Sequence, residues 1–129
     1  MTETENIQSV LVADDDELLA KLIEYKLIQE GYAVTVVGDG AHALEHAFAD
    51  KPDLIVLDGM MPGMDGMEVL RNLKENPETQ NTLVVMLTAR GMERDIVGGL
   101  ELGADEYMVK PFMPGELTTR IKRLLGGPR

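Results

Sequence analysis

The chain has 129 residues, which is enough for one domain with its own hydrophobic core. Apolar residues make up 44% and charged residues 27%, as in soluble globular proteins, and the absence of cysteine excludes disulfide bonds and thiolate metal sites. The formal net charge of −11 argues against direct binding of this domain to nucleic acid, because phosphate contacts need a basic face.

The first residues and the hydropathy of the chain bear on its location. Residues 1–6 are acidic and polar, the opposite of the basic start of a signal peptide. No apolar stretch approaches the length of a membrane span. We therefore predict a cytoplasmic protein that has no membrane partner.

The first half of the chain predicts three strands and two helices. A continuous apolar run at 9–13 predicts a strand buried on both faces, and a helix follows at 16–30 with Asp16 as its N-cap and Gly31 at its end. A β-branched strand at 33–37 and a helix at 41–49 come next. Pro52 separates that helix from a third strand at 53–57.

The second half of the chain continues the same alternation. A loop at 61–66 with strong turn chemistry leads into a helix at 67–75, and a strand follows at 83–87. A helix at 93–102 contains Gly98 and Gly99, each of which costs about 1 kcal/mol relative to Ala. A strand at 107–109 and a helix at 114–125 complete a domain at 7–125. Residues 126–129 resemble the start of a linker or an artificial tail.

This alternation of strands and helices predicts an α/β fold. A doubly wound, five-stranded parallel sheet with five helices on its two faces accounts for it, with right-handed crossovers. The strand order 2-1-3-4-5 fits a domain of this size, with a switch point between the first and third strands. Ligands bind such sheets at the carboxyl ends of the strands.

Polar side chains stand at the carboxyl ends of four of the predicted strands. Asp14 and Asp15 follow the first strand, Asp58 the third, Thr88 the fourth and Lys110 the fifth. Three clustered carboxylates repel one another unless a cation lies among them, and hard oxygen ligands suit Mg2+. The sequence therefore predicts a magnesium site, with the lysine and the threonine left to hold an anion beside the metal.

These residues resemble the receiver domain of two-component response regulators, whose fold is flavodoxin-like (CheY-like). The resemblance covers residues 10–125. It rests on four motifs at the ends of successive strands, namely Asp14-Asp15, Asp58 with the loop 61–66, Thr88-Ala89 and Lys110-Pro111-Phe112. One motif alone would be weak evidence, but all four in order are specific.

The resemblance implies a phosphoacceptor switch rather than an enzyme that acts on other substrates. Asp58 would accept a phosphoryl group from a sensor histidine kinase or a phosphotransfer protein, and would later lose it by slow autodephosphorylation. Asp14, Asp15 and Asp58 would bind Mg2+ together with the backbone carbonyl of Met60. Asp14 would act mostly through a bound water.

The resemblance also implies roles for the remaining strand-end residues. Lys110 would pair with Asp58 and then with the phosphoryl oxygens, and its peptide bond to Pro111 would be cis. Thr88 would turn inward to hydrogen-bond a phosphoryl oxygen, and Tyr107 would follow it from an outward to an inward rotamer.

The last third of the chain is similar to the winged-helix (OmpR/PhoB) subfamily. There, an active homodimer forms through the fourth helix, the fifth strand and the fifth helix, with ion pairs across the interface. The implied partner face holds five residues, Ile96, Leu102, Glu106, Glu116 and Arg120. Ile96 and Leu102 stand where the subfamily usually has charged residues, so this face can pair differently, or the fourth helix can simply be exposed and variable.

Two other functions stay open at this point. A Mg2+-dependent phosphatase or transferase also uses a strand-end aspartate, but many carry a second Asp two residues later, where this chain has Met60. A constitutive interaction module would not need the complete set of acids, threonine and lysine. The resemblance further predicts that Met60 and Arg90, each two residues beyond a key position, slow hydrolysis of the phosphoryl group.

Two further patterns have simpler explanations beside their functional ones. His42 and His46 have the i, i+4 spacing of helical metal ligands, but two ligands alone make a poor site, so surface histidines are the simpler interpretation. Four methionines crowd the stretch after Asp58, at positions 60, 61, 64 and 67. Flexible thioethers suit adaptable binding surfaces, and they suit ordinary packing equally well.

Overall fold

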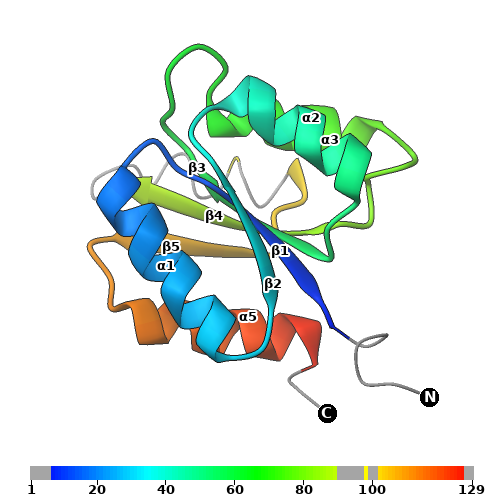
Figure 1. Ribbon diagram of the computed structural model, residues 1–129. Helices are drawn as coiled ribbons and strands as arrows, with labels where there is room; N and C mark the ends of the chain where they lie inside the picture. The colour runs from blue at the N-terminus through cyan, green and yellow to red at the C-terminus, as the bar shows by residue number, and fades with distance from the viewer. Residues whose placement is uncertain (1–6, 90–97, 99–101, 127–129) are drawn as a thin grey trace, which may run out of the picture.

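The computed structural model describes residues 7–89, 98 and 102–126 (Figure 1). Its strands form one parallel sheet in the order β2-β1-β3-β4-β5, which confirms the predicted topology. The strands are β1 (Ser9–Ala13), β2 (Ala33–Val37), β3 (Leu54–Asp58), β4 (Leu83–Ala89) and β5 (Glu106–Lys110). β4 runs two residues further than predicted, because its pairing with β5 continues until Ala89 lies opposite Lys110.

Helices cover both faces of this sheet. They are α1 (Glu17–Gln29), α2 (Gly40–Asp50), α3 (Gly66–Glu75) and α5 (Pro114–Leu125). In Figure 1, α1 and α5 lie on one side of the sheet, and α2 and α3 lie on the other. The helix predicted at 93–102 falls outside the described residues except for Gly98 and Leu102, which are both helical. No helix among the described residues has the length and apolar character needed to cross a bilayer.

Aspartate side chains cap three of the four helices whose bounds are given above. Asp16 accepts a hydrogen bond from the Leu19 backbone N–H at the start of α1, as predicted. Asp39 and Asp65 cap α2 and α3 in the same way, and both helices begin one residue earlier than predicted. These caps fix where each helix leaves the carboxyl end of its preceding strand.

Alternation along the strands divides the core into two layers. The layer against α1 and α5 takes one set of strand residues, Val10, Val12, Leu54, Val56, Val85, Leu87 and Met108. The layer against α2 and α3 takes the intervening residues, Leu11, Ala13, Ile55, Leu57, Val84 and Met86. At the carboxyl ends of the strands the same alternation continues. It places Asp14, Asp58 and Lys110 on the α1/α5 side of the sheet, and Thr88 on the α2/α3 side. The sequence period therefore sends the two acids and the lysine to the same side of the sheet edge.

Candidate functional site

Three carboxylates meet at the carboxyl ends of β1 and β3. Asp14 and Asp58 are buried, with 2% and 5% of their surfaces exposed, and Asp15 beside them is exposed. Each of the three offers a carboxylate oxygen within 4.8 Å of the others. The switch point between the first and third strands thus brings together the acids that the sequence placed there.

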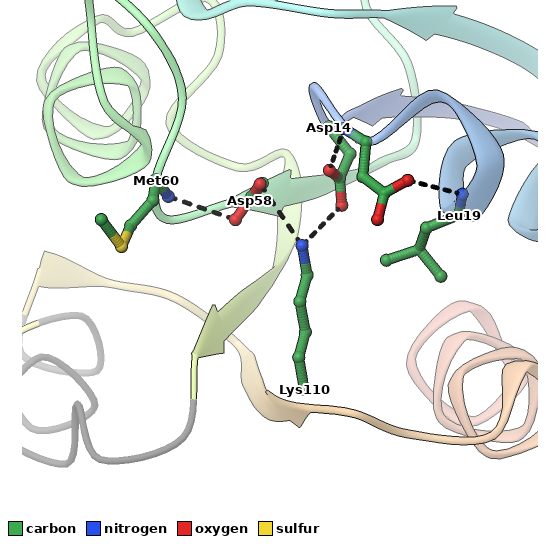
Figure 2. A network of polar contacts seen from close by, with 6 residues as sticks. Asp14, Leu19, Asp58, Met60 and Lys110 are labelled. Atoms are coloured by element: carbon green, nitrogen blue, oxygen red, sulfur yellow. Dashed lines mark hydrogen bonds and ion pairs between the residues drawn. The ribbon is translucent and has the colours of Figure 1, made fainter.

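Lys110 reaches these acids from the edge strand β5, past the intervening strand β4. Its Nζ lies 3.1 Å from Asp14 Oδ2 and donates a 3.4 Å hydrogen bond to Asp58 Oδ2 (Figure 2). The peptide bond between Lys110 and Pro111 is cis, as the sequence resemblance implied. One amine therefore faces two buried carboxylates at once.

Burial and crowding set the proton affinity of Asp58. Burial is the main cause that raises the pKa of Asp58 to about 6, and the charge of Asp14 adds to it. The Met60 backbone N–H and Lys110 act in the opposite direction by stabilising the ionised form. Burial lowers the pKa of Lys110, but the two acids outweigh it, so this pKa is raised and the amine carries its charge.

The site fits a hard divalent cation. Its three carboxylates have one amine among the described residues beside them, paired with Asp14 and Asp58, which leaves an excess of negative charge. Asp14 Oδ1 accepts the Asp16 backbone N–H at 2.9 Å, but the buried Asp14 Oδ2 accepts no well-aligned hydrogen bond among the described residues. This buried oxygen shares the single Lys110 amine with Asp58, so the two acids are only partly neutralised and a further cation would stabilise them. Carboxylate oxygens are the ligands that Mg2+ prefers.

The loop between β3 and α3 folds tightly against the end of β3. Met60 donates its backbone N–H to Asp58 Oδ1 at 3.1 Å, and Gly66 donates its own to the Gly59 carbonyl, also at 3.1 Å. A Cβ added to Gly66 would lie only 2.2 Å from the Asp58 carbonyl oxygen. The sequence identified Gly66 as a turn residue and missed this requirement, although its place directly after the helix-capping Asp65 was a signal.

Thr88 and Tyr107 lie on neighbouring strands beside this site. Thr88 is one residue beyond Leu87, which is the register partner of Asp58, and only 4% of its surface is exposed. Tyr107 is half-buried against the α2/α3 layer, and its hydroxyl donates to the Met67 sulfur at 3.6 Å. Both residues occupy the positions that the sequence assigned them, on the β4 and β5 side of Asp58.

Charged residues of the predicted partner face pair within the chain. Arg120 contacts Glu106 at 3.1 Å and Glu116 at 3.6 Å. Leu102 is half-buried and packs against the α2/α3 layer. Ile96 lies outside the described residues. The exposed charges on β5 and α5 are therefore available for an interface only if they leave their present partners.

The two histidines of α2 do not form a shared site. The Nδ1 of His42 lies 2.7 Å from Asp39, and the Nδ1 of His46 lies 3.0 Å from Asp50. The hydrogen bond to Asp39 raises the pKa of His42. Each ring thus interacts with its own surface carboxylate, in agreement with the simpler interpretation.

The sequence and the geometry agree with a known family. The family model described as the response regulator receiver domain matches residues 10–122 of this chain. The chain belongs to this family. Receiver domains of response regulators are signalling switches in two-component systems, so the family identified from the strand-end motifs is confirmed.

Individual relatives support the same assignment. The chain is 47% identical over 118 residues to the alkaline phosphatase synthesis transcriptional regulatory protein PhoP of Bacillus subtilis (strain 168). The aligned stretch covers 92% of this chain and 48% of that protein. It is 42% identical over 119 residues to the phosphate regulon transcriptional regulatory protein PhoB of Rhizobium meliloti (strain 1021), covering 92% and 52%. The chain thus spans about half the length of the curated relatives it matches.

A solved receiver domain with a bound metal shares the fold. It is the receiver domain of the sensor histidine kinase PA1611 from Pseudomonas aeruginosa PAO1, with a magnesium ion coordinated in its active site cleft. The two chains are 30% identical, with a TM-score of 0.84 over 94% of this chain and 99% of that one. The same fold therefore serves both regulators and sensor kinases.

Proposed function

We propose that Asp58 accepts a phosphoryl group from the phosphohistidine of a sensor histidine kinase or a phosphotransfer protein, in a Mg2+-dependent reaction. The observation that carries this proposal is the setting of the Asp58 carboxylate. One oxygen accepts the Met60 N–H, the other accepts the Lys110 amine, and Asp14 and Asp15 each offer a carboxylate oxygen within 4.8 Å of an Asp58 oxygen. The family of the chain supports it further.

Asp14, Asp15 and Asp58, with the backbone carbonyl of Met60, are the proposed ligands of Mg2+. When bound, the metal supplies positive charge that offsets the carboxylates and the incoming phosphoryl oxygens. The buried Asp14 Oδ2 supports such a role, because it shares the Lys110 amine with Asp58 and accepts no well-aligned hydrogen bond among the described residues. So does the magnesium ion in the related receiver from Pseudomonas aeruginosa.

In the proposed step, an Asp58 oxygen forms a bond to phosphorus while the phosphorus–nitrogen bond to the donor histidine breaks. The bonding electrons leave with the imidazole. The Lys110 amine neutralises charge on the phosphoryl oxygens, and the Thr88 hydroxyl donates a hydrogen bond to one of them. Positioning and charge carry most of the catalysis, because the transition state of phosphoryl transfer is loose.

The proposed output is a change in the surface formed by residues 93–102, β5 and α5. Inward movement of Thr88 and Tyr107 would bias this surface toward a homodimer or an attached output domain. In that dimer Arg120 would exchange its present intrachain partners, Glu106 and Glu116, for acids of the second copy. The assignment to the cytoplasm stays a prediction, as does the absence of nucleic-acid binding by this domain.

A phosphatase that acts on other substrates is a weaker alternative. Many such enzymes place an acid two residues after the nucleophile, and here that position is Met60, whose side chain is a thioether. We also keep the prediction that Met60 and Arg90 slow autodephosphorylation; Arg90 lies outside the described residues. A phosphoryl lifetime of only seconds would contradict it.

Intact-mass measurement with acetyl phosphate and Mg2+ tests the proposed function. The native chain should gain one phosphoryl group, whereas Asp58→Ala and the native chain in EDTA should gain none. Asp53→Ala is a matched control, because Asp53 lies at the opposite end of the sheet and should leave uptake intact. Equal uptake by Asp58→Ala and the native chain would overturn the assignment of Asp58.

A further inference from the structure

Met60 is an exposed thioether directly beside the candidate phosphoacceptor. Its side chain is among the most exposed large apolar groups of the described residues, with 60% of its surface accessible. Its backbone N–H donates to Asp58 Oδ1 at 3.1 Å, and Figure 2 shows the two residues side by side. The Met60 backbone is therefore fixed to the carboxylate, while its thioether is exposed to solvent.

The other methionines provide a graded comparison. Met61, Met86 and Met108 are buried, with 7%, 0% and 4% of their surfaces exposed. Met64 and Met67 are partly buried against the α2/α3 layer. Apart from Met60, only Met113 is as accessible among the described residues, with 72% of its surface exposed. An oxidant in solution should therefore meet Met60 and Met113 first, because oxidation of methionine follows exposure.

We propose that Met60 is an oxidation site through which peroxide shortens the lifetime of the phosphoryl group on Asp58. This inference rests on the proposed function of Asp58. In the oxidation step, one peroxide oxygen is transferred to the Met60 sulfur, the O–O bond breaks, and water leaves. The sulfur is oxidised by two electrons and the peroxide is reduced by two.

The consequence follows from the polarity of the product. A thioether is apolar and holds little water, whereas a sulfoxide oxygen is a strong hydrogen-bond acceptor that would hold water two residues from the phosphoacceptor. More water beside the acyl phosphate accelerates its hydrolysis. We expect the phosphoryl group to be lost about two to ten times faster, which is the size of one net hydrogen bond.

The test combines peroxide treatment with a phosphoryl lifetime. The full chain is treated with hydrogen peroxide, loaded with acetyl phosphate and Mg2+, and followed by intact mass, which distinguishes an added oxygen from an added phosphoryl group. Peptide mapping then locates the oxygen. Met60 and Met113 should be oxidised before Met61, Met86 and Met108, and the Met60 sulfoxide should accompany the faster loss.

Variants separate Met60 from the other methionines. Each variant is compared with and without peroxide, so that it serves as its own reference. The oxidant effect should vanish in Met60→Leu and persist in Met113→Leu. It should persist also in Met92→Leu, which removes a methionine outside the described residues. Treatment with methionine sulfoxide reductase should restore the slower loss in the native chain.

The possible failures point to different conclusions. An unchanged lifetime in the fraction oxidised at Met60, or oxidation of buried methionines before Met60, would overturn the inference and leave the proposed function standing. An effect that persists in Met60→Leu would overturn it as well. No phosphoryl uptake by the untreated chain would contradict the proposed function itself, and the inference would fall with it.

Discussion

The two ends of the sheet use the same residue type in opposite ways. At the amino end, Asp53 accepts the Ser9 backbone N–H at 2.8 Å, and Asp105 accepts the Val84 backbone N–H at 2.8 Å. At the carboxyl end, Asp14 and Asp58 face each other and share Lys110. An aspartate whose oxygens are satisfied by the backbone stabilises the fold, whereas a group of aspartates left with too few donors can bind a cation and react.

Replacing a lysine at each end of the sheet should give the largest difference in phosphoryl uptake between the two ends. Lys110→Met leaves two buried acids without their amine, so phosphoryl uptake from acetyl phosphate should fall on the order of a hundredfold. Lys74→Met is the matched control, because Lys74 Nζ donates to the Gln80 and Thr82 carbonyls near the start of β4. A similar loss of uptake in both variants would show that the carboxyl end of the sheet has no special role in the reaction.

The raised pKa of Asp58 predicts a stability that depends on pH in the metal-free protein. The pKa is about 6 in the folded chain against 3.8 for the free side chain, so ionisation of Asp58 destabilises the fold as pH rises through this window. In EDTA, Asp58→Asn should be more stable than the native chain at pH 7.5 by about 1–2 kcal/mol, after allowance for solvent screening.

Urea denaturation at several pH values measures this difference in stability. The advantage of Asp58→Asn should shrink as pH falls through 6 and disappear near pH 4, where the native carboxyl is already protonated. Asp53→Asn serves as the control at the other end of the sheet, since its carboxylate is satisfied by Ser9. A constant advantage across the pH range would show that burial of charge is not its cause.

Loss of a satisfied aspartate should affect stability alone. Asp105→Ala removes the acceptor of the Val84 N–H and should lower the free energy of unfolding by about 1 kcal/mol, whereas Asp105→Asn keeps an acceptor oxygen and should lower it less. Phosphoryl uptake by both folded variants should match that of the native chain. If a fully folded Asp105 variant took up less phosphoryl group than the native chain, the amino end of the sheet would also influence the reaction at the carboxyl end.

The smallest effect is expected for the exposed ion pairs of Arg120. Arg120→Ala removes contacts to Glu106 and Glu116, yet such pairs contribute less than about 0.5 kcal/mol to the stability of the unphosphorylated chain. Size-exclusion of the phosphorylated chain should show a larger effect, because Arg120 is proposed to pair across the dimer. If phosphorylated Arg120→Ala formed the same amount of dimer as the native chain, Arg120 would not belong to the partner face.

Periodicity and strand-end positions were enough to predict the sheet and the main site. The runs that end at Asp14 and Asp58 are short and apolar, and parallel strands bring their carboxyl ends to one edge whatever the details of the loops. Lys110 could be predicted for the same reason, since its side chain is long enough to pass β4. These predictions depend on the backbone topology and on little else.

Contacts that depend on how a loop closes could not be predicted. Asp53 was assigned to the third strand, but its side chain folds toward Ser9, and β3 begins at Leu54. The contact between the Asp105 carboxylate and the Val84 backbone N–H at the start of β4 was not predicted either. Likewise, no sequence rule separates the exposed Met60 from the buried Met61, because that difference follows from the path of the loop.

The loop between β3 and α3 packs closely behind Asp58. An added Cβ at Gly66 would be 2.2 Å from the Asp58 carbonyl oxygen, and one at Gly40 would be 2.3 Å from the Met64 carbonyl oxygen, so there is no slack on this side. A group attached to Asp58 would therefore find little room on the α3 side. If Asp58 is phosphorylated as proposed, the structural response would therefore run across β4 and β5, away from α3.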